Sequence, residues 1–137
     1  DLEVYHPEKI RRVISSKSAR QVKSMMRLVV EDEGTGKKAA MIGYTVCGKT
    51  GTAQKALKDK KGYSQDNYTS IFAGFAPEND PELAILVAID EPKNLYYGGD
   101  VAAPAFKTIM AESFNYLNIP PEKSNPMVVA LSPGEKN

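Results

Sequence analysis

The chain has 137 residues, 42% of them hydrophobic, which is enough for one domain or for part of one. Its 18 basic and 17 acidic residues give a formal net charge of +1, so the composition argues against nucleic acid as a partner. A single cysteine and a single histidine, His6, exclude an internal disulfide bond and a metal cluster of cysteines and histidines.

The N-terminal part of the sequence predicts a connector followed by one helix. Asp1 to Arg12 is polar and has the composition of a connector that enters from an upstream segment. Apolar residues then recur at helical spacing and predict a helix of about four turns, with Ser15 or Ser18 as the N-cap and Gly34 as the stop signal. The apolar stripe of this helix, which we expect to pack on the sheet, consists of Val22, Met25, Met26, Val29 and Val30.

The next segment carries the tetrapeptide Lys49-Thr-Gly-Thr52, the strongest functional signal in the chain. Tyr44 to Cys47 are β-formers and predict a strand that continues through this tetrapeptide. Because alternate side chains share one face of a strand, Thr50 and Thr52 point the same way and Lys49 points the other way. Gly51 leaves a gap that lets another backbone come close. Two hydroxyls, a glycine and an ammonium group are suited to hold a peptide that ends in a carboxylate.

Three features around the tetrapeptide are predicted to have structural roles only. Gly34 to Lys38 is a glycine-rich turn, which we interpret as a solvated connector. Cys47 lies in the β-forming run with no histidine near it in sequence, so we expect a small buried residue and not a nucleophile. Lys55 to Asn67 is predicted to be a polar hairpin loop between two strands.

Two further strands complete the predicted sheet. Tyr68 to Phe75 alternates loosely between apolar and polar residues, and a turn from Ala76 to Glu82 follows it. Leu83 to Ile89 is a nearly continuous apolar run, which is typical of a strand buried on both faces. We therefore expect a layer on each side of an antiparallel sheet of three consecutive strands.

The last predicted element is a helix from Asp100, as N-cap, to about Asn118. Pro104 is tolerated in its first turn, and Ile119-Pro-Pro121 ends it. The segment from 120 to 137 has no periodic signal and is predicted to be a mobile tail. The apolar stripe of this helix is predicted to consist of Ala105, Phe106, Ile109, Met110 and Leu117.

A rival motif overlaps the tetrapeptide. Gly43 to Thr50 fits the pattern of a phosphate-binding loop, and the apolar run ending in Asp90 fits the strand that holds magnesium in such proteins. A phosphate-binding loop must curl so that its amide groups converge, whereas Tyr44 to Cys47 prefers to be extended. The residues after Lys49 also lack the apolar period of a helix. The physical argument therefore disfavours a nucleotide-binding protein.

The tetrapeptide resembles the third motif, Lys-Thr-Gly, of the serine penicillin-binding proteins. The helix before it, the turn from Gly34, the strand from Tyr68 and the segment from Gly98 to Phe106 are similar to class B members in the same order. The resemblance spans roughly Tyr5 to Ile119. It implies that residues 1 to 119 form the C-terminal portion of a transpeptidase domain. The fold class that the resemblance implies is α/β of the α+β type, with three consecutive antiparallel strands that are covered by helices and belong to a five-stranded sheet.

The first two motifs of that family are absent from the sequence. No serine is followed three positions later by lysine, so the chain has no Ser-x-x-Lys motif. Ser113-Phe-Asn115 spells the second motif, but it follows Lys49 instead of preceding it and lies in the last predicted helix. We expect the nucleophile, the general base and the second motif upstream of Asp1, and we expect the chain alone to be inactive.

The resemblance implies a peptidoglycan D,D-transpeptidase that cross-links stem peptides through a serine acyl-enzyme and is inhibited by β-lactams. Lys49 and Thr52 would be catalytic, with Lys49 supplying positive potential and the Thr52 backbone N–H forming half of the oxyanion hole. Thr50, Gly51 and Thr52 would bind the substrate and its terminal carboxylate. The chemistry needs no cofactor and no metal. A non-catalytic β-lactam sensor and a β-lactamase-related domain remain alternatives, because they share the motif.

The same resemblance implies partners and a location. The partners would be peptidoglycan stem peptides, β-lactams, the upstream portion of the same protein and a second copy pairing at an open sheet edge. The family acts in the bacterial cell envelope, outside the cytoplasmic membrane, where an N-terminal helix anchors it. This sequence has no apolar run long enough to span a bilayer and no signal peptide, so we expect the chain itself to be soluble and the anchor to lie outside it.

Overall fold

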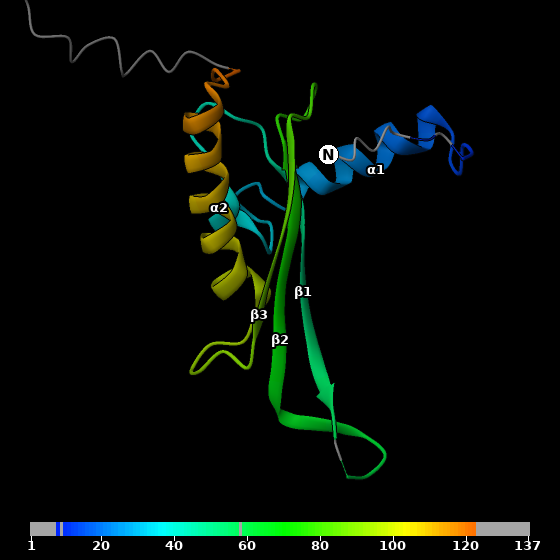
Figure 1. The fold of residues 1–137 in the computed structure, drawn as a ribbon, viewed down its shortest axis with the longest axis vertical. Coiled ribbons are helices and arrows are strands. Elements are labelled where there is room, and N and C mark those ends of the chain that lie inside the picture. The colour runs from blue at the N-terminus through cyan, green and yellow to red at the C-terminus, as the bar shows by residue number, and fades with distance from the viewer. Residues whose placement is uncertain (1–7, 9, 58, 123–137) are drawn as a thin grey trace, which may run out of the picture.

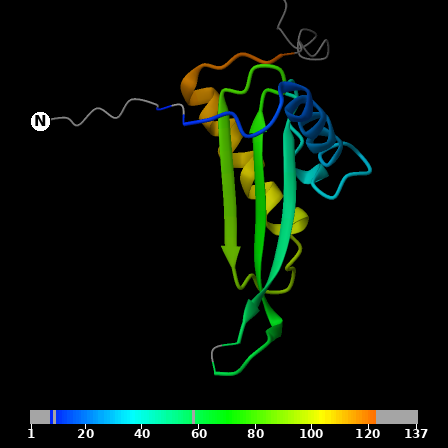
Figure 2. The same ribbon diagram turned by 90° about the vertical axis from the view of Figure 1, so that its right-hand side faces the viewer.

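The computed structural model describes residues 8, 10–57 and 59–122. The elements follow the order α1 (Ser16–Leu28), a 3₁₀ turn η1 (Lys37–Ala39), β1 (Cys47–Ala56), β2 (Tyr63–Ala76), β3 (Leu83–Asp90) and α2 (Gly98–Leu117). The strands form one antiparallel sheet with β2 in the centre, as Figure 2 shows face-on. The predicted class and the three consecutive strands are confirmed. Most of the predicted connector, including His6, and nearly all of the predicted tail lie outside the described residues.

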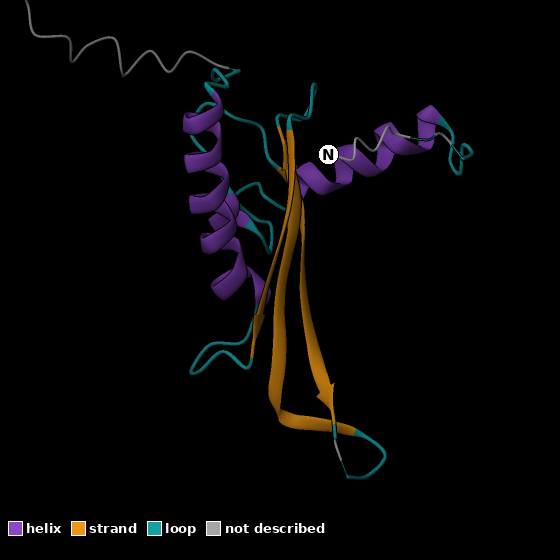
Figure 3. Ribbon diagram, in the orientation of Figure 1, coloured by secondary structure: helices purple, strands orange, loops and turns teal. Residues whose placement is uncertain are grey.

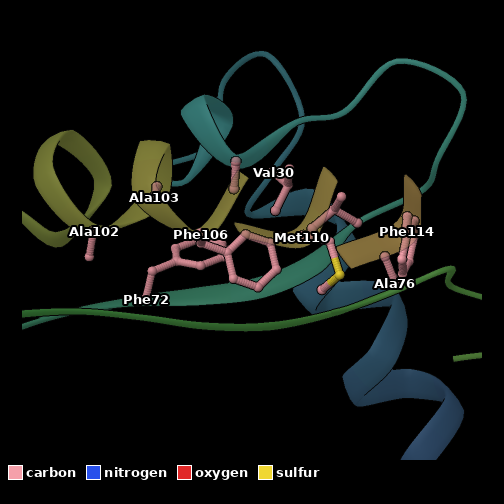
Figure 4. Close-up of a cluster of buried hydrophobic side chains, with 10 residues drawn as sticks. Val30, Phe72, Ala76, Ala102, Ala103, Phe106, Met110 and Phe114 are labelled. Carbon is pink, nitrogen blue, oxygen red and sulfur yellow. The ribbon is translucent and has the colours of Figure 1, made fainter. Parts of the chain in front are cut away.

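Helices lie on both sides of the sheet, but they cover it unequally. α2 runs along one face, whereas α1 lies on the other side and only at one end (Figures 1 and 3). The core fills the space between α2 and the sheet, where the Phe72 and Phe106 rings pack with centroids 4.7 Å apart (Figure 4). The buried core consists of Val30, Ala39, Val46, Phe72, Ala76, Ala102, Ala103, Phe106, Met110 and Phe114.

The uneven cover explains the burial pattern of β3. Its odd-numbered residues, such as Ile85 and Val87, pack against the core, while the even-numbered residues face away from α2 and are exposed. Leu86, on the exposed side, is 66% exposed. The prediction that this strand is buried on both faces is therefore wrong for this chain, because α1 is too short and too far toward one end to cover it.

α1 begins where the sequence predicts it, and its N-cap is Ser15, whose Oγ accepts a hydrogen bond of 3.0 Å from the Ser18 backbone N–H. It ends at Leu28, six residues before the predicted stop at Gly34. No residue of α1 is buried, and Val22 and Met25 are 50% and 62% exposed. The prediction that its stripe is core is thus wrong, except for Val30 beyond the helix end. Instead Val22 and Met26 of the stripe line one wall of an open apolar groove of about 400 Å³ against the outer face of the sheet.

α2 begins three residues earlier than predicted, with Tyr97 and not Asp100 as its N-cap. Asp100 lies in the first turn, where its carboxylate pairs with Lys38 Nζ at 2.8 Å. The predicted stripe is correct for Phe106 and Met110. It is wrong for two members that lie on the solvent side of the helix, and it omits one buried aromatic ring. The exposed members are Ile109 and Leu117, and the omitted residue is Phe114.

The strand boundaries also differ from the prediction. β1 begins at Cys47, since Gly43 has a φ of 82° and Tyr44 turns its hydroxyl to the Ile119 carbonyl oxygen at 2.7 Å. The β1–β2 pairing continues past a register shift after Gln54, so the hairpin loop is shorter than predicted. The paired strands extend as a ribbon beyond the N-terminal end of α2 (Figure 1). None of the described helices is long and apolar enough to cross a membrane.

Candidate active site

The motif residues lie on β1, which in the described part of the chain is an edge strand that pairs only with β2. In the register of this pair, Thr50 lies opposite Phe72 and Thr52 lies opposite Ser70. Both threonines therefore share the face that carries α2, because Phe72 and Ser70 are buried on that face. Lys49 is offset by one residue and belongs to the opposite face, as the alternation predicted.

The start of α2 is joined directly to the motif strand. The backbone N–H of Gly98 donates a hydrogen bond of 3.1 Å to Thr52 Oγ1. A Cβ atom at position 98 would overlap the carbonyl oxygens of Gly51 and Ile71, so only glycine lets the helix begin this close to the sheet. A Cβ atom at Gly51 would meet only the Ile71 side chain, at 3.3 Å or more, so among the described residues no backbone occupies the gap predicted at Gly51.

The other threonine is contacted from the turn after α1. Thr35 Oγ1 and Thr50 Oγ1 are 3.1 Å apart, and Lys49 Nζ lies 2.9 Å from the Thr50 carbonyl oxygen and 3.4 Å from Thr50 Oγ1. The prediction of a solvated connector from Gly34 to Lys38 is correct in part: Thr35, Lys37 and Lys38 are exposed, but Gly36 is buried. The segment is also more than a connector, since Thr35 reaches the motif strand. A cleft of about 270 Å³ is lined here by Thr35, Thr50, Tyr97, Gly98, Gly99 and Asp100.

The lysine side chains around the motif strand differ in whether they are paired with a carboxylate. Among the described residues, Lys49 forms no salt bridge and its side chain is exposed, whereas Lys38 is paired with Asp100. Lys55 is bound by Asp90 at 2.8 Å and by Glu91 at 2.7 Å. Hydrogen bonds to these two carboxylates raise the pKa of Lys55, and the bond from Lys55 is the main cause that lowers the pKa of Asp90.

These contacts speak against the phosphate-binding alternative. Lys49 and Thr50 lie inside a strand and not at the start of a helix, so the amide groups before them do not converge on one point. Asp90, the proposed magnesium ligand, is held by Lys55 and by the hydroxyl of Thr69. The described residues include no group of three or more histidine, cysteine, aspartate or glutamate side chains that is arranged to bind a metal.

Two other candidates are located away from the site. Cys47 is fully buried, and burial raises the pKa of its thiol from 9.0 to about 11, with a smaller contribution from the charge of Glu78. The prediction of a small buried residue is confirmed. Ser113 Oγ donates a hydrogen bond of 2.7 Å to the Ile109 carbonyl oxygen within α2, so the Ser-x-Asn match there belongs to the helix.

The loop between β3 and α2 brings aromatic rings near the motif, which the sequence analysis did not anticipate. Tyr68 stacks on Tyr96 with ring centroids 4.3 Å apart, and Tyr96 contacts Tyr97 at 4.5 Å. Ser70 Oγ anchors this loop by donating a hydrogen bond of 2.5 Å to the Tyr96 carbonyl oxygen. The hydrogen bond to Tyr97 raises the pKa of the Tyr96 hydroxyl. The only sequence signal was two adjacent tyrosines before Gly98.

Comparison with known proteins identifies the family. A family model described as the penicillin binding protein transpeptidase domain matches residues 3–111. The chain is 43% identical over 114 residues to the probable peptidoglycan D,D-transpeptidase PbpC of Pseudomonas aeruginosa, and 45% identical over 115 residues to stage V sporulation protein D of Bacillus subtilis. This chain belongs to the penicillin-binding protein transpeptidase family, which confirms the predicted resemblance.

Solved structures agree with this assignment. The chain superposes on the transpeptidase domain of penicillin-binding protein 3 from Burkholderia pseudomallei with a TM-score of 0.73 and 38% identity, over 83% of this chain and 34% of that one. For penicillin-binding protein 3 from Mycobacterium tuberculosis, complexed with ampicillin, the TM-score is 0.76 at 34% identity. This match covers 91% of this chain and 29% of that one. The two curated relatives are matched over 82% and 83% of this chain but over only 20% and 17% of their own length.

Proposed function

We propose that this chain supplies the Lys-Thr-Gly-Thr strand of the catalytic cleft of a peptidoglycan D,D-transpeptidase. The observation that carries the proposal is the placement of the Thr50 and Thr52 hydroxyls on one face of an edge strand. The ammonium group of Lys49, which forms no salt bridge with the described residues, lies 3.4 Å from Thr50 Oγ1. The nucleophilic serine comes from polypeptide outside these 137 residues, because the sequence contains no Ser-x-x-Lys motif. The partial match to the relatives is consistent with this division.

The reaction in which these residues act is acyl transfer. The serine oxygen attacks the penultimate D-Ala carbonyl of one stem peptide, the terminal D-Ala leaves, and the amine of a second stem peptide takes the acyl group from the serine. A β-lactam acylates the same serine and stops the cycle. Lys49 raises the positive potential of the cleft, and the Thr52 backbone N–H stabilises the oxyanion. Gly51 leaves room for the substrate backbone beside the strand.

The hydrogen bonds of Thr52 support a role in binding the terminal carboxylate. A hydroxyl has one proton to donate, and an N–H group can only donate. Because the Gly98 N–H donates to Thr52 Oγ1, the proton of Thr52 must point to a different acceptor. A carboxylate is an acceptor with two oxygens and accepts strong hydrogen bonds. Thr52 is thus prepared for an anionic substrate group before the substrate arrives.

A β-lactam sensor or a β-lactamase-related domain would also react with penicillin through the same motif. The names of the relatives, which include several D,D-transpeptidases, favour the synthetic enzyme. The three functions differ in the fate of the acyl group, which a transpeptidase passes to an amine, a β-lactamase passes to water and a sensor retains. We further propose that the protein acts outside the bacterial cytoplasmic membrane, where peptidoglycan lies.

The test uses a hybrid domain, in which this chain replaces the matched segment of the Burkholderia pseudomallei domain. We expect fluorescent penicillin to label the hybrid domain covalently, and a stem-peptide thioester to be transferred to a D-amino acid acceptor. The chain alone should not be labelled. A folded hybrid domain that is not acylated would contradict the proposal, and hydrolysis without transfer would favour the β-lactamase alternative.

A further inference from the structure

The loop that carries Thr35 is fixed beside the motif strand by contacts with α2 and with the C-cap of α1. Its carbonyl oxygen lies against Gly99, where a Cβ atom would overlap it, so the loop packs directly on the first turn of α2. The next residue, Gly36, is buried and donates a hydrogen bond of 2.8 Å to the Val29 carbonyl oxygen after α1. Lys38 pairs with Asp100 of α2 at 2.8 Å. The backbone that carries Thr35 is therefore fixed on both sides.

The hydroxyl of Thr50 has two neighbours that can donate to it. Thr35 Oγ1 lies 3.1 Å from Thr50 Oγ1, and either of these oxygens can be the donor. The Lys49 ammonium group, which can only donate, lies 3.4 Å from the same oxygen. A hydroxyl oxygen has two lone pairs and one proton. If Thr35 also donates, both lone pairs of the Thr50 hydroxyl oxygen are occupied. The Thr50 hydroxyl must then donate its own hydrogen bond to a third group.

We propose that Thr35 is a positioning residue that directs the Thr50 proton to the terminal carboxylate of the substrate. This inference rests on the proposed function, because it assigns that carboxylate to Thr50. With an acceptor bound, Thr35 donates to Thr50 and Thr50 donates to the carboxylate, so the two hydroxyls form one chain of hydrogen bonds. Each bond in such a chain polarises the next, which strengthens the bond to the anion.

Thr35 has the same place relative to Thr50 that Gly98 has relative to Thr52. Gly98 donates through its backbone N–H, which is fixed in direction, whereas the hydroxyl of Thr35 can turn. Removing the Thr35 hydroxyl should therefore weaken binding of a carboxylate and leave binding of an uncharged group nearly unchanged. A residue that only stabilised the loop would affect both ligands alike.

The experiment compares two ligands on the hybrid domain. Second-order acylation rate constants are measured with benzylpenicillin and with its methyl ester, which lacks the carboxylate. In Thr35→Val we expect a loss of roughly threefold to tenfold for benzylpenicillin, the size of one ordinary hydrogen bond, and little change for the ester. Thr35→Ser keeps the hydroxyl and should restore the rate. In a Thr50→Val background, Thr35→Val should have no further effect.

The matched control is Thr108→Val, which removes the hydroxyl that donates to the Pro104 carbonyl oxygen within α2 and should change neither rate constant. Equal losses for both ligands in Thr35→Val, or no loss for benzylpenicillin, would overturn the assignment of Thr35. Independent, additive effects of the Thr35 and Thr50 variants would overturn it as well. If the unmodified hybrid domain were folded but not acylated, the proposed function itself would fail, and this assignment would fail with it.

Discussion

The backbone N–H of Gly98 donates a hydrogen bond of 3.1 Å to Thr52 Oγ1, which links the first residue of α2 to the motif strand across 46 positions of sequence. The same glycine lies against the carbonyl oxygens of Gly51 and Ile71. The start of the helix therefore fixes both the hydroxyl of Thr52 and the backbone beside Gly51. The long α2 helix, which packs on the core, thus also orients the proposed substrate-binding strand.

Thr52→Val in the hybrid domain tests the role of this hydroxyl. Valine has nearly the same shape and keeps the backbone N–H, so the variant loses a hydrogen bond to the carboxylate but keeps the oxyanion donor. We expect a loss of about 1–3 kcal/mol of transition-state stabilisation in penicillin acylation. An unchanged rate constant would show that the hydroxyl does not contact the ligand, and Thr108→Val again serves as the control.

Lys49→Ala tests the electrostatic role of the ammonium group. Lys49 is exposed, and its described hydrogen bonds go only to Thr50, so thermal stability should barely change. Acylation by fluorescent penicillin should be slower by roughly 100-fold or more, as for the loss of one electrostatic donor. Lys60→Ala, at an exposed position of the hairpin loop, should leave the rate unchanged. Equal rates in Lys49→Ala and the unmodified hybrid domain would refute the role.

Local pattern was sufficient to predict the motif strand, because a period of two places Thr50 and Thr52 together wherever the strand lies. It could not predict the partners of their hydroxyls. Thr35 and Gly98 reach the site across 15 and 46 positions of sequence, and such contacts depend on packing and leave no local signature. Periodicity likewise identified the apolar side of α1, but it contains no information about what covers that side.

Phe106→Ala tests the core between α2 and the sheet. Phe106 is fully buried and contacts Phe72, so its loss leaves a cavity that the rigid strand cannot fill. We expect the hybrid domain to lose about 3–5 kcal/mol of unfolding free energy in urea. Ile109→Ala, on the same helix but 47% exposed, should cost less than about 1 kcal/mol. Similar costs for the two variants would contradict the burial assigned to this face of α2.

The buried thiol of Cys47 makes stability depend on pH in the alkaline range. Burial raises the pKa of Cys47 from 9.0 to about 11, so the folded state keeps the thiol neutral while the unfolded state ionises. The contribution is complete below pH 9 and is lost as the pH rises to about 11, at a cost of roughly 2 kcal/mol. Urea denaturation of the hybrid domain at pH 8 and 10.5 measures this loss of unfolding free energy, and the Cys47→Ala variant should lose less. Identical losses in the variant and the unmodified hybrid domain would contradict the role of Cys47.

The last prediction concerns the face of the sheet turned away from α2. Ala84, Leu86 and Ala88 of β3 lie on this face, and Leu86 is 66% exposed. In the described residues, β3 pairs only with β2, so its other edge also presents open N–H and C=O groups. An apolar face beside an open strand edge favours association with a second chain.

The 137-residue chain on its own should therefore self-associate at micromolar concentration, as measured by size-exclusion chromatography with light scattering. Leu86→Lys places a charge at the centre of the exposed face and should shift the population toward monomer. Leu95→Lys, at a loop leucine that is 55% exposed, should not do so. In the hybrid domain, the remaining part of the Burkholderia pseudomallei domain should cover this face, so the unmodified hybrid domain should be monomeric. If the isolated chain were a stable monomer that unfolds cooperatively, the prediction of self-association would be wrong, and three strands with one covered face would be sufficient for a stable fold.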